Sequence, residues 1–144
     1  MTGRDFLTLA SCLVAGADEA SWRTAVSRAY YAAFHVARQL MNDLGFTVPY
    51  ADRAHGYLWL RLQNSGEPSV VQAGADLKDL RGLRNKADYD LSFSLRSPFA
   101  RTQYSTAESI ILALEAAAVE PIRSQIVAGM RAYEVAIGQV SWRP

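Results

Sequence analysis

Two arginines, an asparagine, a lysine and two aspartates are concentrated in residues 81–90, which read RGLRNKADYD. At 3.6 residues per turn, Arg81, Arg84, Asn85 and Asp88 share one face of a helix. Guanidinium groups form paired hydrogen bonds to phosphate and carboxylate, so this face could hold a phosphate or bind a partner protein. The alternative is an internal ion pair from Arg84 to Asp88, spaced i to i+4, that only stabilises the fold.

A second polar strip follows the same helical spacing earlier in the chain. Arg28, Tyr31 and His35 occur at steps of three and four, with Tyr30 and Phe34 adding aromatic bulk beside them. An imidazole beside a guanidinium is suited to acid–base chemistry on a phosphodiester. The alternative is structural, with His35 hydrogen-bonded to a neighbouring helix and the aromatic rings used in core or dimer packing.

Helical periodicity of the apolar residues accounts for nearly the whole chain, and no strand pattern competes with it. The second helix is expected to begin at a cap, Asp18 or Ser21, and to end at Gly45. We therefore predict an all-α fold, an up-and-down helical bundle of five to six helices forming a single domain over residues 1–144. The predicted helices cover residues 4–15, 22–44, 52–64, 69–89, 101–119 and 120–140.

The first helix is expected to turn Phe6, Leu9 and Leu13 inward. Cys12 is the single cysteine and lies within this apolar pattern, so we expect a buried thiol. One cysteine excludes an intramolecular disulfide and is typical of a reducing compartment.

Aromatic residues outside the main apolar stripes suggest a surface that needs covering. A small bundle with such residues has a physical reason to form a homodimer. The residues in question are Trp59, Tyr104, Tyr133 and Trp142.

Composition restricts the classes of function. The formal net charge is +1, which gives no overall case for nucleic-acid binding, but the 15 basic residues are thirteen arginines and two lysines. Any phosphate site must therefore be a local concentration of arginine.

His35 and His55 are the only histidines, and no metal-ligand or glycine-rich phosphate motif is present, so we expect no metal and no cofactor. The apolar runs are too short to span a membrane, and we expect a cytoplasmic protein.

The two polar strips together resemble a known family. Residues 27–35 read SRAYYAAFH and residues 83–90 read LRNKADYD. In order and spacing they resemble the HEPN domain, in particular its small stand-alone bacterial and archaeal members, and the resemblance spans residues 5–140. It implies an up-and-down bundle that forms homodimers, in which the motif helices of both subunits face a shared cleft. Many such proteins act in toxin–antitoxin or defence systems beside a minimal nucleotidyltransferase.

Many HEPN toxins cleave RNA without a metal, using an Arg-polar-x-x-x-His pattern in which the arginine holds the scissile phosphate. Here Arg84 and Asn85 match its start, while Tyr89 stands where the histidine would fall. Tyrosine is a poor base at neutral pH, and losing general acid–base help costs roughly 10²–10⁴-fold in rate. His35 on the other motif helix is the available substitute.

Two functions stay open at this point, beside the alternative of a structural helical protein with no chemistry at the cleft. The first is a homodimeric HEPN-type binding or regulatory module, whose cleft binds RNA, a nucleotide or a nucleotidyltransferase partner without catalysis. The cleft residues are Arg81, Arg84, Asn85 and Asp88, with Arg28 and Tyr31 as further ligand contacts. The alternative is a metal-independent ribonuclease toxin in which Arg84 and Asn85 act on the phosphate and Tyr89 or His35 has an unusual catalytic role.

Overall fold

A computed structural model describes residues 1–143, and this part of the chain contains six α-helices. The all-α prediction is confirmed, and helix ends agree with the sequence pattern to within a few residues. No helix in the described part combines the length and apolar character needed to cross a membrane. The helices are α1 (Gly3–Val14), α2 (Glu19–Asp43), α3 (Arg53–Gln63), α4 (Pro68–Tyr89), α5 (Ser97–Ala117) and α6 (Ile122–Ile137).

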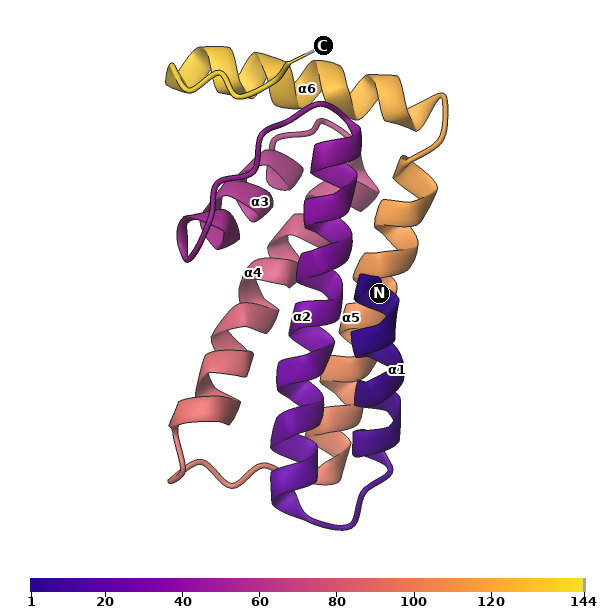
Figure 1. Ribbon diagram of the computed structural model, residues 1–144, viewed down its shortest axis with the longest axis vertical. Helices are drawn as coiled ribbons and strands as arrows, with labels where there is room; N and C mark the ends of the chain where they lie inside the picture. The colour runs from indigo at the N-terminus through magenta and orange to yellow at the C-terminus, as the bar shows by residue number, and fades with distance from the viewer. Residues whose placement is uncertain (144) are drawn as a thin grey trace.

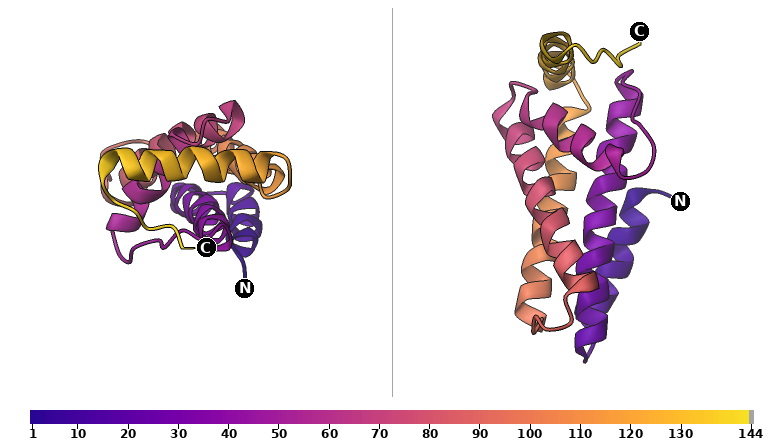
Figure 2. Two further views of the ribbon diagram at one scale, coloured as in Figure 1. Left: turned by 90° about the horizontal axis from the view of Figure 1, so that it is seen from above. Right: turned by 90° about the vertical axis from the view of Figure 1, so that its left-hand side faces the viewer.

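Four of the helices form an elongated bundle whose chain direction alternates. Figure 1 shows α1, α2, α4 and α5 along the long axis, with the short α3 beside α4. The last helix does not join this up-and-down pattern, because α6 lies across one end of the bundle (Figures 1 and 2). The position of α6 therefore differs from the sequence prediction, in which all helices alternate in direction along the bundle.

Small residues on α2 let the neighbouring helices approach its backbone closely. Five alanines of α2 are fully buried, and Gly3 at the start of α1 packs directly against the same face. A Cβ added at Gly3 would lie 2.7 Å from the carbonyl oxygen of Ala32, closer than atoms can approach without a shift. The α1–α2 contact therefore requires a residue without a side chain at position 3. The alanines are Ala25, Ala29, Ala32, Ala33 and Ala37.

This close contact explains why the sequence expectation for α1 was wrong for Leu9 and Cys12, although Phe6 packs against the core and Leu13 is half-buried. Leu9 is 46% exposed and Cys12 is exposed, whereas Leu7 and Ala10 are buried together with Gly3. The buried positions step by four and three, so the inward face is rotated away from Leu9. Small residues at positions 3 and 10 decide the orientation because they allow the shortest distance between the two helices.

The ends of two helices also differ from the sequence pattern. The sequence pattern predicted a helix from residue 101, but α5 begins at Ser97 with Pro98 in its first turn. The fixed φ of proline suits this position, where no N–H donor is needed. At the other end, α6 stops at Ile137 because Gly138 adopts a left-handed conformation with φ 70°.

The aromatic residues that suggested an uncovered surface are instead half-buried within the monomer. Tyr104 and Trp142 pack against the main core. The rings of Trp59 and Tyr133 each lie 5.7 Å from an arginine guanidinium carbon, those of Arg81 and Arg61 respectively. These four residues therefore give no physical reason for dimerisation.

A buried ion pair attaches α6 to the bundle. Arg61 Nε on α3 donates to Glu134 Oε2 on α6 at 2.9 Å, with side chains only 4% and 1% exposed. Glu134 also accepts from the backbone N–H groups of Ser141 and Trp142 at 2.9 and 3.1 Å. Burial alone would raise the pKa of Glu134, but the hydrogen bonds from Ser141 and Arg61 outweigh it and lower that pKa.

We predict that Glu134→Gln lowers the free energy of unfolding by about 3 kcal/mol, because a buried guanidinium that loses its partner charge keeps its desolvation cost. Urea denaturation at pH 7 measures the change. Glu108→Gln on the exposed face of α5 is the matched control and should change stability little. Equal stability of the two variants would contradict the role assigned to the Glu134 pair.

Candidate functional site

The face of α4 predicted from the sequence meets the polar strip of α2 through Arg84. Arg84 Nη2 donates to the hydroxyl of Tyr31 at 2.8 Å, and Nη1 donates to Asn85 Oδ1 at 2.8 Å. Its Nε lies 3.0 Å from Asp88 Oδ2, in an ion pair that lacks the alignment of a hydrogen bond. The Arg84–Asp88 pair that the spacing allowed therefore exists, with side chains 14% and 26% exposed.

Arg28 joins the same group from α2. Its guanidinium carbon lies 5.1 Å from the centre of the Tyr31 ring, and that of Arg84 lies 4.9 Å from it. Ser27 connects Arg28 to Asp88, because the serine hydroxyl accepts from Arg28 Nη2 at 3.3 Å and donates to Asp88 Oδ2 at 3.2 Å. Two arginines thus share one tyrosine ring and one carboxylate.

Arg81 lies one turn before Arg84, with its guanidinium carbon 5.7 Å from the Trp59 ring of α3. We call Arg28, Arg81 and Arg84 the arginine cluster. The Nε atoms of all three are buried and make no hydrogen bond within residues 1–143. Among the ion pairs of the described residues, Asp88 is the one carboxylate paired with the cluster. The cluster therefore carries more positive charge than its surroundings neutralise.

The two residues proposed to replace the missing histidine lie on different sides of the cluster. Tyr89, in the last turn of α4, is 74% exposed, and its ring centre is 5.7 Å from the guanidinium carbon of Arg84. His35 lies one turn beyond Tyr31, with their ring centres 6.3 Å apart, and it stacks on Phe6 of α1. Burial lowers the pKa of His35, and Arg38 and Arg28 lower it further.

The structure adds His55, which sequence reasoning did not place at this site. His55 on α3 is 7% exposed, and its Nδ1 hydrogen-bonds the hydroxyl of Tyr30. Burial lowers its pKa, and the nearby positive charge of Arg81 lowers it further. Burial also raises the pKa of Tyr30, against the opposing effect of Arg81. Only the packing of α3 against α2 and α4 brings His55 here, and the spacing of residues within one helix could not reveal it.

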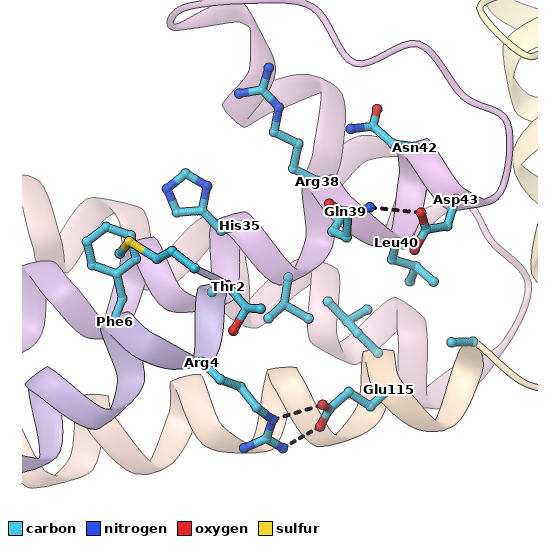
Figure 3. A pocket seen from close by; sticks show the side chains of 15 residues that line it. Thr2, Arg4, Phe6, His35, Arg38, Gln39, Leu40, Asn42, Asp43 and Glu115 are labelled. Atoms are coloured by element: carbon cyan, nitrogen blue, oxygen red, sulfur yellow. Dashed lines mark hydrogen bonds and ion pairs between the residues drawn. The ribbon is translucent and has the colours of Figure 1, made fainter.

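A hollow of about 760 Å³ lies beside this site, between α1, α2 and α5 (Figure 3). Phe6 and His35 form the side nearest the cluster, while the arginines of the cluster lie outside it. Arg4 and Glu115 form an ion pair across the α1–α5 side, which Figure 3 shows opposite His35. The hollow is therefore a separate feature that borders the polar strip of α2.

Within residues 1–143, histidine, cysteine and acidic side chains form no group of three or more that could hold a metal ion. Comparisons of the chain with models of protein families, with curated proteins and with solved structures find no match. Geometry and chemistry therefore carry the functional interpretation.

We predict that stability falls when the pH drops from 7 to 5, in part through His55. The pKa of His55 in the folded state lies below the usual value near 6.5. As the pH falls, the unfolded chain therefore binds a proton before the folded protein does, and this lowers the free energy of unfolding. The loss per histidine is at most about 1.4 kcal/mol per pH unit. Urea unfolding at both pH values should show a smaller loss for His55→Gln, and an unchanged loss would contradict the assignment.

Proposed function

We propose that this protein is a HEPN-type module that binds phosphate groups of RNA or of a nucleotide at the arginine cluster. The observation that carries the proposal is the charge imbalance of the site: each of the three arginines has a buried Nε that makes no hydrogen bond, and among the ion pairs of the described residues only Arg84 is paired with a carboxylate, that of Asp88. Partly buried cations without partners are costly, and a bound phosphate would supply both the charge and the acceptors that they lack.

Contacts within the site support binding because they hold the arginines in place before a ligand arrives. Arg84 is fixed by the Tyr31 hydroxyl and by Asn85, and Arg28 lies against the Tyr31 and Phe6 rings. Arginine side chains lose rotamer entropy on binding, so contacts that already restrict them reduce this cost. Planar guanidinium groups held in this way can form paired hydrogen bonds to phosphate oxygens.

The proposal includes a homodimer, because Arg28, Arg81 and Arg84 are only half-buried in the monomer and keep part of their surface open to a second copy. A second copy facing the cluster would bring two clusters to one ligand. Together with the HEPN resemblance, this favours a role in a toxin–antitoxin or defence system beside a nucleotidyltransferase partner. A monomer mass at micromolar concentration in solution would count against the dimer.

We predict that Arg84→Ala weakens binding of a single-stranded oligoribonucleotide at least tenfold, because it removes one phosphate contact and frees Tyr31. The slope of log affinity against log salt should also fall by about 0.7 for each lost contact to a single strand. Fluorescence anisotropy at several salt concentrations measures both quantities. Arg101→Ala, which removes an exposed arginine on α5, is the matched control.

Identical affinity and salt slope for wild type, Arg84→Ala and Arg101→Ala would overturn the proposed site. Circular dichroism of each variant separates loss of binding from loss of folding.

A second function, metal-independent RNA cleavage, is favoured by the exposure of Tyr89 beside Arg84. A substrate held by Arg84 could reach the Tyr89 hydroxyl, whereas His55 is too buried to act on it.

For this second function we predict that wild type cleaves cellular RNA in the presence of EDTA and that Arg84→Ala does not. Tyr89→Phe and His35→Ala then identify the group that moves the proton, with a loss of roughly 10²–10⁴-fold expected for that group. If folded wild type binds RNA but does not cleave it, the ribonuclease function is excluded and the binding function stands.

A further inference from the structure

The hollow between α1, α2 and α5 is connected to the arginine cluster through Phe6. The Phe6 and His35 rings are stacked, with centres 5.3 Å apart and planes inclined by 12°. The guanidinium carbon of Arg28 lies 5.4 Å from the centre of the same Phe6 ring. The Phe6 ring therefore lies between His35 and Arg28 of the cluster, and Phe6 and His35 both line the hollow.

The lining of the hollow differs in chemistry from the cluster. Its surface is mostly apolar, with Val36, Leu40 and Leu114 among the residues that form it. Gln39 and Asn42 add amide groups at the edge, where both are exposed (Figure 3). An apolar cavity of this size with a few amide donors and acceptors suits a flat heterocyclic ring better than a phosphate.

A further cation, Arg38, lies one turn beyond His35 on α2. Arg38 lines the hollow, and its guanidinium carbon lies 5.7 Å from the exposed Tyr50 ring. Arginines thus contact aromatic rings at two places beside α2, where Arg84 and Arg28 lie against Tyr31 and Arg38 lies near Tyr50. Positive groups beside stacking rings are the pattern that binds the backbone and the bases of a single strand.

We propose that this hollow binds a nucleobase of a single-stranded RNA, stacked on the His35 ring that Phe6 supports, while a phosphate about three nucleotides away on the same strand binds the arginine cluster. The inference rests on the proposed function and adds the class of ligand and the site of its base. Duplex RNA is excluded as the ligand because its bases are paired and stacked and their faces are not available to protein rings.

The dimensions of α2 set a minimum length for the ligand. Arg28 and His35 are seven residues apart, about 10 Å along a helix. Successive nucleotides of a stacked strand are spaced by about 3.4 Å, so roughly three nucleotides separate the phosphate from the base in the hollow. A mononucleotide would contact the cluster alone, and affinity should rise between one and four nucleotides.

The test is a double-mutant cycle that pairs a protein variant with a modified ligand. The ligands are a tetraribonucleotide and the same tetramer with its bases removed. The test variant is Phe6→Leu, and the control is Leu9→Ala, which changes an exposed residue of the same helix α1. Wild type should bind the abasic tetramer about tenfold more weakly, the loss expected for one stacked base. Phe6→Leu should weaken binding of the intact tetramer by a larger factor than binding of the abasic tetramer, because Phe6 lines the hollow and also contacts Arg28 of the cluster.

Asn42→Asp provides a second variant that leaves the core untouched. A negative charge at the edge of the hollow should weaken binding of the intact tetramer severalfold, and circular dichroism should show an unaltered fold. Equal affinity of wild type for intact and abasic tetramers, with Arg84→Ala still weakening both, would overturn the base site while leaving the proposed function intact. If Arg84→Ala also had no effect on either ligand, the proposed function itself would fail.

Discussion

The structure depends on how closely helices approach the small-residue face of α2. Buried alanines and the glycine at the start of α1 bring backbones together, so that little space remains for large side chains between the helices. Three large polar side chains of α2, those of Arg28, Tyr31 and His35, are half-buried along one edge of this face. Arg28, Tyr31 and His35 therefore lie where α1 and α4 flank this edge, and the same packing that stabilises the bundle assembles the polar site.

The sequence predicted the fold well because helical periodicity and capping are local signals. Asp18 caps α2 as expected, its carboxylate accepting from the backbone N–H of Ser21 at 2.8 Å. The Arg84–Asp88 pair was also predictable, since residues four apart on a helix are neighbours. The exposure of Leu9 on α1 was not predictable from the sequence. Leu9 is more hydrophobic than the buried Gly3, yet close backbone approach at Gly3 decides the orientation of the helix.

Features that depend on three or more helices could not be predicted from spacing. His55 reaches the site only because α3 packs against Tyr30 and Phe34 of α2. The hollow requires the relative placement of α1, α2 and α5, and the crossing of α6 depends on close approach at Gly129. A Cβ there would lie 2.1 Å from the carbonyl oxygen of Ser65. The HEPN resemblance associates the two motifs with one site. The functions that the resemblance implies stay predictions.

The C-terminal segment that accompanies Glu134 has a consequence for how the molecule opens. Trp142 Nε1 donates to the carbonyl oxygen of Leu44 at 2.9 Å, and Trp142 pairs with Phe46 in an isolated bridge. These contacts join the end of α2 to residues beyond α6, so α6 and the α2–α3 loop must loosen as one cooperative unit. The cluster at Arg84 lies toward the other end of α4, so this unit can open while the ligand-binding edge keeps its geometry.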